Sequence, residues 1–476
     1  MASESFVGLD LGTSALKGVV VSFAGDLLPS ARREYPTERP APGRAEQDPH
    51  DWLAALADVV GRLAAEVPST SWNGIGLTGM IPTLVTIDAH GEPTGPAITW
   101  EDTRAEEEGK EFRASVGPEE LYRSTGQWVD GRYLLPMFRW IERNDPQRVA
   151  ATDTLLGARD FLFAWMTGER ATDPSTATGF GCYRLADGMW MDAAARVRLP
   201  QTRPAAEASP LLDVRARQLA LPDGIPITLG CADSVAAAFA LGIRRPGDLA
   251  YVWGTSTVLL GVDPTPRTDN AHRYLVTPLA TGNSFGLEMD LLSTGAALEW
   301  CANLLGVPGP REVLELASRS QRGANGARFL PYLAFGEQGA LWDPDLRGAL
   351  GGLTTLHTKD DVARALVEGI VLESRRCVEV LDESDAAPTE IRVTGSIAGS
   401  TFFLQQLADA TARPVLSHRI GSAAALGAAM IASGQERTTE PAERIEPDPA
   451  TAAEWSELFR RHDEHLTASR RARGSG

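Results

Sequence analysis

The segment FVGLDLGTSALKGVVVSF at residues 6–23 places a short turn, Gly12-Thr13-Ser14, between two apolar runs with the character of β-strands. The same turn returns about half a chain later as Gly254-Thr255-Ser256, between LAYVW at 249–253 and VLLGV at 258–262. Glycine lets a backbone approach a ligand closely, and clustered backbone N–H groups form an anion-binding concavity. Ordinary turn chemistry explains either copy alone, because Gly, Thr and Ser all favour turns. Two copies in matching contexts predict two lobes that hold one polyphosphate between them.

Length and composition narrow the class of protein. A chain of 476 residues is too long for one hydrophobic core and predicts two or three domains. The net charge of −18 argues against a nucleic-acid partner, which would need basic stripes, but it is compatible with a local ATP site. No apolar run approaches the roughly 18 residues of a membrane span, and MASESF lacks the pattern of a signal peptide. We therefore expect no membrane partner.

The four cysteines are far apart and form no CxxC pair, which fits neither a zinc site nor a disulfide framework. This usage predicts a reducing, cytoplasmic location. They are Cys182, Cys231, Cys301 and Cys377.

Strand-like and helical segments alternate in both halves, which indicates an α/β fold. The charged turn 244–248 is the best candidate boundary, so we expect an N-terminal domain at 1–245 and a C-terminal domain at 246–476. Asp48-Pro49 has the signature of a helix start. Further strands are expected at 75–79, 83–88, 225–230 and 391–395, and further helices within 101–143, at 403–411, at 422–433 and from about 449.

Two familiar phosphate-binding motifs do not indicate a P-loop enzyme or a dinucleotide-binding enzyme here. The P-loop pattern GxxxxGK[ST] does not occur. A GxGxxG does occur at Gly74, Gly76 and Gly79, but a dinucleotide site needs this motif between a strand and a helix. Here the following residues are β-like and contain Pro82, so we interpret the match as coincidental and exclude an NAD-dependent oxidoreductase.

Two aspartates carry the candidate chemistry. Asp10 ends a buried strand directly before the first turn, where a carboxylate is costly unless it is paired or bound to a cation. Beside a triphosphate this position predicts Mg²⁺ binding. Lys17 either adds a positive charge there or is a solvated strand lysine. Asp233 lies between a buried strand and a small-residue helix, so it is either a helix cap or a general base at the mouth of the sheet.

Two further groups of polar side chains are expected to lie on the solvated surface. The acidic cluster Glu101, Asp102 and 106–108 is typical of a solvated helix face. His462 and His465 lie three residues apart in a charged tail, where we expect surface histidines in preference to a metal site.

At this point the residues resemble the FGGY carbohydrate kinases, and among them most closely the D-xylulokinases, along nearly the whole chain. The matching segments, in the family's order, are GLDLGTSALKGVVV, AEQDPHDW, PAITWEDTRA, LTGERATDPSTATG, LGCADSVAAAFALG, VWGTSTVLL, FLPYLAFGEQGALWDPDLRGALGGL, IRVTGSIAGS and AAALGAA. The resemblance implies two actin-like (ribonuclease-H-like) domains flanking a deep cleft, and transfer of the γ-phosphate of ATP to a sugar hydroxyl with Mg²⁺.

The resemblance also assigns roles to residues. Asp233 is implied as the catalytic base and Asp10 as the carboxylate associated with Mg²⁺. Nucleotide binding is implied for Gly12, Thr13, Ser14, Lys17, Gly254, Thr255, Ser256, Gly295, Gly395, Ser396 and Ser400. The acceptor side is implied at Ile81, Pro82, Trp100, Asp102, Arg104, Asp233 and Ser234, which removes Asp102 from the solvated cluster.

Departures from the D-xylulokinase pattern leave the sugar open. Met80-Ile81-Pro82-Thr83 stands where those kinases read Gln-Met-His-Gly, so a sugar-contacting histidine is replaced by Pro82, and Ser234 stands where Asn or Gln is common. We expect a ketopentose such as D-xylulose first, with ribulose, glycerol or erythritol types as alternatives. A nucleotide-gated binding protein of the actin/Hsp70 type is the competing class, because it shares the paired turns but needs neither an alcohol-directed base nor a sugar pocket. The oligomeric state is open, with a homodimer as one option.

Overall fold

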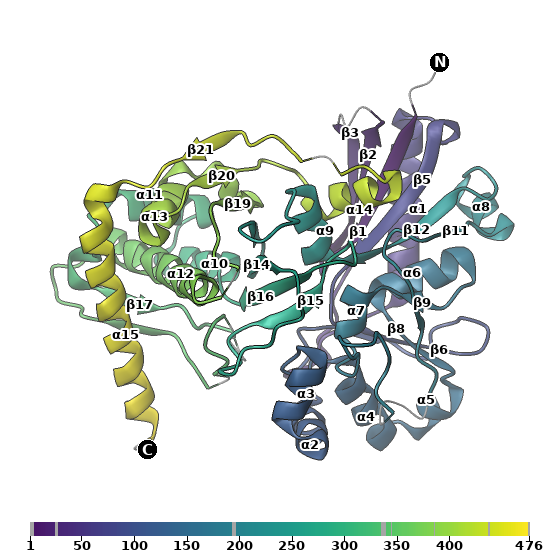
Figure 1. The fold of residues 1–476 in the computed structure, drawn as a ribbon, viewed down its shortest axis with the longest axis horizontal. Helices are drawn as coiled ribbons and strands as arrows, with labels where there is room; N and C mark the ends of the chain where they lie inside the picture. The colour runs from purple at the N-terminus through teal and green to yellow at the C-terminus, as the bar shows by residue number, and fades with distance from the viewer. Residues whose placement is uncertain are drawn as a thin grey trace.

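Each half of the chain folds around its own central sheet, and the two sheets form the two lobes in Figure 1. The computed structural model describes residues 4–23, 27–192, 197–334, 339–343, 345–384, 386–436 and 438–474.

The first sheet has the order β11-β12-β5-β1-β2-β3. Its strands are β1 (Ser5–Leu11), β2 (Ala15–Ser22), β3 (Leu27–Glu34), β5 (Trp72–Gly79), β11 (Ala208–Pro210) and β12 (Pro226–Ala232). The predicted hairpin is confirmed: β1 and β2 run antiparallel, and the register pairs Asp10 with Lys17. Strand β5 lies parallel to β1, and β12 lies parallel to β5. The carboxyl ends of these parallel strands therefore meet beside the hairpin turn.

The second sheet has the order β15-β16-β14-β13-β19-β20-β21. Its strands are β13 (Leu249–Trp253), β14 (Thr257–Asp263), β15 (Leu275–Pro278), β16 (Phe285–Leu291), β19 (Ile391–Thr394), β20 (Val415–Ser417) and β21 (Glu443–Ile445). Strands β13 and β14 form the second antiparallel hairpin, and β19 lies parallel to β13. The local order of hairpin and neighbouring parallel strand is thus the same as in the first sheet.

The remaining elements cover the sheets and build the outer walls. Helices of the first half are α1 (Pro49–Glu66), α2 (Glu106–Val116), α3 (Pro118–Thr125), α4 (Leu134–Asn144), α5 (Pro146–Ala151), α6 (Ala158–Thr167), α7 (Pro174–Thr178), α8 (Asp213–Leu219) and α9 (Asp233–Ala240). Those of the second half are α10 (Gly295–Leu305), α11 (Pro310–Arg319), α12 (Lys359–Asp382), α13 (Thr401–Thr411), α14 (Ala423–Ser433) and α15 (Ala452–Gly474). Short strands are β4 (Glu46–Gln47), β6 (Leu84–Ile87), β7 (Ala97–Ile98), β8 (Thr154–Gly157), β9 (Ala171–Thr172), β10 (Gln201–Thr202), β17 (Arg328–Leu330) and β18 (Ala349–Gly351).

Two helices cover opposite faces of the first sheet. Helix α1 begins as predicted, with the Asp48 side chain accepting from the His50 N–H and Pro49 at the first helical position. On the other face lies α14, from the second half of the chain. A Cβ at Gly8 or Gly76 would lie 1.8 Å or 2.0 Å from a backbone oxygen of α14. The GxGxxG match therefore lies inside β5, and Gly76 is required for helix packing.

Helix α14 also shapes the domain division. The turn 244–248 lies between α9 and β13, the last element of the first half and the first strand of the second sheet. Buried residues of α14 nevertheless pack in one cluster with α9 and with strands of both sheets. The boundary at 245/246 stays a prediction, because one helix of the second half belongs physically to the first sheet.

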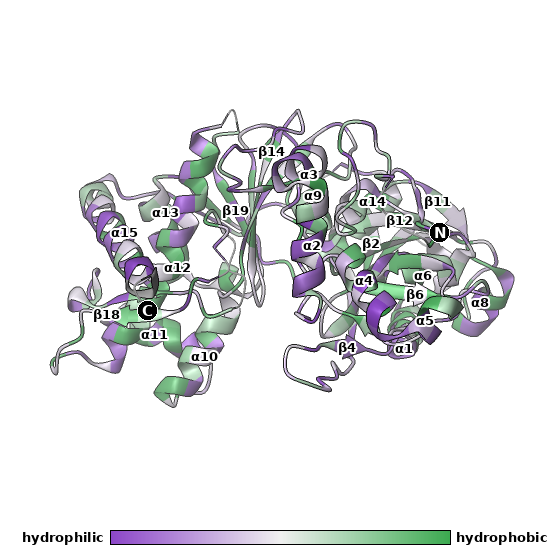
Figure 2. Ribbon diagram, turned by 90° about the horizontal axis from the view of Figure 1, so that it is seen from below, coloured by the Kyte–Doolittle hydropathy of each residue, from purple (hydrophilic) through white to green (hydrophobic). Residues whose placement is uncertain are grey.

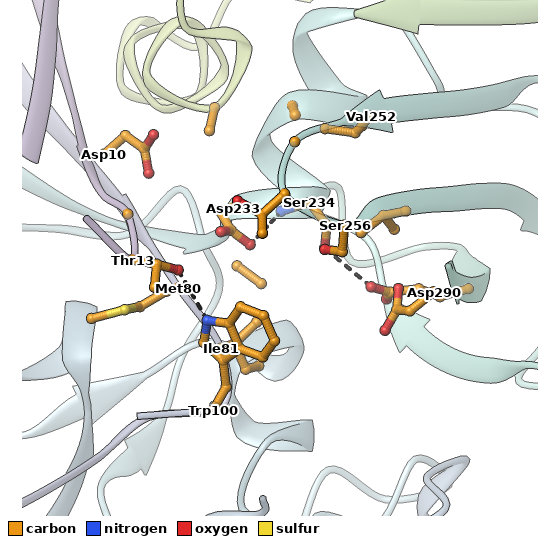
Figure 3. A pocket seen from close by; sticks show the side chains of 18 of the residues that line it. Asp10, Thr13, Met80, Ile81, Trp100, Asp233, Ser234, Val252, Ser256 and Asp290 are labelled. Atoms are coloured by element: carbon orange, nitrogen blue, oxygen red, sulfur yellow. Dashed lines mark hydrogen bonds between the residues drawn. The ribbon is translucent and has the colours of Figure 1, made fainter. Parts of the chain in front are cut away.

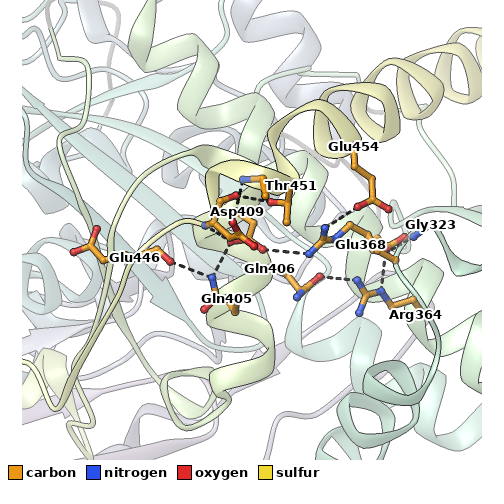
Figure 4. Close-up of polar contacts among 12 residues, drawn as sticks. Gly323, Arg364, Glu368, Gln405, Gln406, Asp409, Glu446, Thr451 and Glu454 are labelled. Carbon is orange, nitrogen blue, oxygen red and sulfur yellow. Dashed lines mark hydrogen bonds and ion pairs between the residues drawn. The ribbon is translucent and has the colours of Figure 1, made fainter.

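Charged side chains tie α15 to the rest of its lobe (Figure 4). Arg322 pairs with Asp409 at 3.3 Å and with Glu454 of α15 at 2.7 Å. The expectation of a surface histidine at 462 is wrong: His462 is buried, and its Nε2 lies 2.7 Å from Glu373 Oε1. A helix expected to be solvated turns one face inward, so its histidine becomes a structural partner.

Figure 2 shows that α2, which lies at the lower edge of the first lobe in Figure 1, is largely hydrophilic. Its Glu106 and Glu107 are exposed, in line with the solvated face expected there, whereas Glu108 is buried and pairs with Arg143 at 2.9 Å. Among the described residues, no helix has both the length and the apolar character needed to cross a bilayer.

Candidate active site

The two Gly-Thr-Ser turns line one cavity of about 400 Å³ between the lobes (Figure 3). The Gly12 N–H closes the first turn on the Ala15 carbonyl at 3.1 Å, and the Gly254 N–H closes the second on the Ser256 carbonyl at 2.8 Å. The structure brings most predicted site residues together on this cavity. They are Asp10, Gly12, Thr13, Ser14, Lys17, Ile81, Pro82, Trp100, Asp233, Ser234, Gly254, Thr255, Ser256 and Gly395.

A second cavity of about 1280 Å³ adjoins the second turn. It shares Gly254 and Thr255 with the first cavity and is lined by α10, α11 and the loop after β19, where the predicted Gly295, Ser396 and Ser400 lie. An elongated ligand that reaches from one cavity into the other would pass the second Gly-Thr-Ser turn. This arrangement suits a nucleotide with its phosphates in the first cavity and its adenosine in the second.

Glycines at this junction are required by close packing. A Cβ at Gly295 would lie 2.2 Å from the Gly254 carbonyl oxygen, and one at Gly395 would lie 2.0 Å from the Trp253 carbonyl oxygen. Gly395 also has φ +95°, a conformation that L side chains rarely adopt. Both glycines therefore allow the loop after β19 and the start of α10 to touch the phosphate turn.

Asp10 is a buried carboxylate at the mouth of the first turn. Burial raises its pKa above the ordinary range, and Lys17 Nζ, 3.8 Å from Oδ2, acts in the opposite direction. Its Oδ1 has no hydrogen-bond partner among the described residues. A buried carboxylate oxygen with open coordination fits a hard cation such as Mg²⁺. The described residues form no cluster of three or more His, Cys, Asp or Glu side chains able to hold a metal, so phosphate oxygens would have to complete this site.

Asp233 is the first residue of α9 and follows β12 directly. Burial, and then the nearby charge of Asp10, raise its pKa to about 7. Its Oδ1 accepts from the Ser234 N–H at 2.8 Å. Asp10 and Asp233 border the same open space in Figure 3. A carboxylate with a pKa near neutrality is suited to take a proton from a hydroxyl group.

A buried chain of polar groups holds the backbone just before this aspartate. The Ala232 N–H donates to Ser175 Oγ at 2.9 Å, and the Ser175 hydroxyl donates to Asp173 Oδ2 at 2.6 Å. Arg159 donates through Nη2 to Asp173 Oδ1 at 2.6 Å and through Nη1 to the Leu229 carbonyl at 2.6 Å. The end of β12, where its pairing with β5 shifts register, is therefore fixed by side chains from α6 and α7.

The acceptor side contains one correction. Trp100 lines the cavity, and its Nε1 donates to Thr13 Oγ1 at 2.9 Å (Figure 3). Asp102 and Arg104, expected beside the sugar, line neither of the two cavities. Asp102 instead accepts from the Ala45 N–H and from Arg104, both at 2.7 Å, and Arg104 also pairs with Glu46 at 2.6 Å. These two side chains brace the loop that carries Trp100.

Sequence reasoning missed the wall that the second lobe contributes. Glu288 and Asp290 of β16 and Thr277 of β15 line the first cavity, opposite Arg132 and Gln127 of the first lobe. The signal was present in FGLEMDLL: two acidic residues two positions apart in an apolar strand lie on the same face of the sheet.

Comparisons with known proteins identify the family of this chain. The model of the FGGY family of carbohydrate kinases matches with its N-terminal domain at residues 5–240 and with its C-terminal domain at 249–435. A xylulose kinase of Staphylococcus xylosus is 28% identical over 439 residues, 90% of this chain and 91% of that protein. A gluconokinase of Bacillus subtilis (strain 168) is 26% identical over 448 residues, 89% of this chain and 86% of that protein.

The crystal structure of a xylulose kinase from Rhodospirillum rubrum superposes with a TM-score of 0.89 at 29% identity, covering 98% of this chain and 99% of that one. The predicted architecture of two actin-like (ribonuclease-H-like) α/β domains is thereby confirmed. The matched family models span both lobes and both turns. The chain belongs to the FGGY family of carbohydrate kinases.

Proposed function

We propose that this kinase transfers the γ-phosphate of ATP to a hydroxyl group of a ketopentose such as D-xylulose, with Asp233 as the general base. The observation that carries the proposal is the position of Asp233. It is a buried carboxyl with a pKa raised to about 7, on a cavity that both phosphate turns also line. A nucleotide-gated binding protein of the actin/Hsp70 type would need the turns but not this carboxyl.

Different residues bind the phosphates, the adenosine and the metal ion during in-line phosphoryl transfer. Backbone N–H groups at 13–14 and 255–256 hold the phosphates, and the larger cavity beside Gly295 and 396–400 accepts the adenosine. Asp10 would hold Mg²⁺, which when bound neutralises phosphate charge. Lys17 adds a positive charge beside Asp10.

Proton transfer completes the reaction. The acceptor oxygen forms a bond to the γ-phosphorus, the bond from the γ-phosphorus to the β–γ bridging oxygen breaks, and ADP leaves with that electron pair. The hydroxyl proton passes to the Asp233 carboxylate. Contacts between the lobes, such as Gln127 Nε2 donating to the Val276 carbonyl at 2.9 Å, enclose the acceptor and exclude water.

Support for a ketopentose comes from the relatives, several of which are xylulose kinases. Pro82 lines the cavity and has no side-chain donor, so ribulose, glycerol and erythritol remain the alternative acceptors. We also propose a cytoplasmic location, where the four buried free cysteines stay reduced, and a homodimer as the assembly to test.

The decisive variant is Asp233→Asn, which keeps the shape and removes the proton acceptor. Loss of a general base lowers rates by about 10²–10⁴-fold, so we expect acceptor-stimulated ADP release to fall by this factor while calorimetry shows MgATP binding unchanged. Asp213→Asn, an exposed residue of α8, is the matched control. Near-normal turnover by Asp233→Asn eliminates Asp233 as the base.

A screen of pentuloses, hexuloses and polyols for acceptor-dependent ADP release identifies the substrate. A ketopentose with the highest kcat/KM supports the proposal. If no acceptor raises turnover above basal ATP hydrolysis, the proposed reaction is wrong.

A further inference from the structure

The second lobe places two carboxyl side chains of β16 on the acceptor side of the cavity. Glu288 and Asp290 point to the same face of the strand, and Thr277 of β15 supports Glu288 by donating its hydroxyl to Oε2 at 2.6 Å. Residues Leu275 and Leu292 complete this wall with apolar surface. Figure 3 shows Asp290 across the open space from Asp233 and Trp100.

Glu288 reaches across the lobe boundary to the residue next to the base. The Ser234 hydroxyl donates to Glu288 Oε1 at 3.3 Å. Burial, and then the charge of Asp290, raise the pKa of Glu288 to about 8, and Glu288 in turn contributes to the raised pKa of Asp233. The pocket thus already contains more carboxyl groups than it can readily ionise together.

The positive side chains of the cavity are engaged with carboxylates. Lys17 and Arg132 are the lysine and arginine among its described lining residues. Lys17 lies 3.8 Å from Asp10, its cross-strand neighbour. Arg132 donates to both carboxylate oxygens of Asp130, through Nε at 3.0 Å and Nη2 at 2.6 Å to Oδ2 and through Nε at 3.1 Å to Oδ1. A carboxylate brought in by a substrate would compete with these pairs.

We propose that Glu288 and Asp290 select uncharged sugars and polyols as acceptors and exclude sugar acids. The inference rests on the proposed function and deepens it. A desolvated carboxylate needs a cationic partner, whereas hydroxyl groups can donate to carboxylates and accept from the Thr277 and Ser234 hydroxyls. Repulsive groups placed against the wrong substrate are a common source of specificity. The relatives include a gluconokinase and a xylulose kinase. The carboxyl groups of this wall would favour the uncharged kind of acceptor over the sugar-acid kind.

The test compares two acceptors of equal length that differ in one terminal group: D-gluconate, with a carboxylate, and D-glucitol, with a hydroxymethyl group. The best uncharged acceptor from the screen is measured beside them. Assays use the full chain, saturating MgATP and a pH of about 9.5, well above the raised pKa of Glu288, so that its carboxyl group is ionised. The readout is the ratio of kcat/KM for the uncharged acceptor to that for D-gluconate. Losses of folded protein or of nucleotide affinity affect both acceptors equally and cancel in this ratio.

We expect the wild-type ratio for the best uncharged acceptor to exceed about 100, since the carboxylate of D-gluconate would be desolvated beside like charges and would have to compete for Lys17 and Arg132. Glu288→Gln and Asp290→Asn should each lower the ratio by about tenfold, because each removes one repulsive charge. Glu66→Gln, an exposed residue of α1, should leave it unchanged. Efficient use of D-gluconate by the wild type, or an unchanged ratio in both variants, overturns the inference.

Binding distinguishes failure of this inference from failure of the proposed reaction. If no acceptor is phosphorylated, the reaction is wrong, and calorimetry with D-glucitol and D-gluconate in the presence of MgADP still measures the charge preference. Tighter binding of D-glucitol than of D-gluconate supports the inference. Equal binding, tighter binding of D-gluconate, or no binding of either contradicts it.

Discussion

Removal of the buried Ser175 hydroxyl should lower kcat, although this side chain does not contact the substrate. In Ser175→Ala the Ala232 N–H loses its acceptor at 2.9 Å, and Asp173 loses the hydroxyl donor at 2.6 Å. Ser175, Asp173 and Arg159 are each only 1% exposed, so no solvent replaces the lost partner. An unsatisfied buried donor costs about 1–3 kcal/mol. The main chain can regain a partner only by shifting, and the next residue along is Asp233.

The size of the rate effect follows from this cost. If this cost of about 1–3 kcal/mol is added to the activation free energy because Asp233 is displaced, kcat falls by roughly 5- to 150-fold. The KM for MgATP should stay within about twofold, because the turns at 12–14 and 254–256 belong to other strands. Coupled ADP release gives kcat and KM, thermal unfolding gives the stability loss, and amide hydrogen exchange of 229–235 reports the local loosening.

The matched control is Ser5→Ala. Ser5 is fully buried and lies at the end of β1 far from the turn, where its hydroxyl donates to the Ser71 carbonyl at 3.2 Å. It should lose stability with kcat unchanged. A positioning role for Ser175 is wrong if Ser175→Ala loses no more kcat than Ser5→Ala at equal stability, or if exchange at 229–235 does not increase.

Two further predictions concern the base and the nucleotide junction. The pKa of Asp233 is raised to about 7, so this base is protonated and inactive in acid. We therefore expect kcat/KM to increase about tenfold per pH unit below roughly pH 6 and to become constant above about pH 8. A flat profile from about pH 5 to 8 argues against this assignment. Gly295→Ala should raise the KM for MgATP by about tenfold with the acceptor KM unchanged. The new Cβ would lie 2.2 Å from the Gly254 carbonyl oxygen and must displace the turn at 254–256. A tenfold change corresponds to a loss of about 1.4 kcal/mol in binding free energy. Gly61→Ala in α1, where a Cβ meets nothing within 4 Å, is its control, and equal KM values for the two variants would contradict the steric argument.

Local signals were enough for much of the fold. The hairpins around Gly12 and Gly254 and the helix after Asp48 were predicted because strand alternation, turn residues and capping groups act between residues close in sequence. Long-range packing was not accessible in this way. Gly76 appeared only as part of a coincidental motif, yet the backbone of α14, from the other half of the chain, requires a glycine there. His462 was expected at the surface because its partner Glu373 lies on a different helix.

The candidate site divides along the same line. Residues in motifs, among them Asp10, Asp233 and both turns, were singled out because each motif is a continuous stretch, and they line one cavity. Asp102 and Arg104 share a motif with Trp100, but sequence does not show which side of a loop faces the cavity, and they brace it from behind. Glu288 and Asp290 belong to no phosphate motif, and they meet Arg132 and Ser234 only because the two lobes face each other.

The amino-acid sequence by itself determined the α/β class and the duplicated Gly-Thr-Ser hairpins, because these depend on local periodicity and on turn residues, and its short motifs identified the family and thereby the reaction type. The tertiary structure determined which charges surround the acceptor. The pKa of Asp233 and the carboxyl wall at Glu288 arise from burial and from groups brought together across the lobes. Electrostatic effects depend on distance and dielectric environment, and neither exists until the chain has folded.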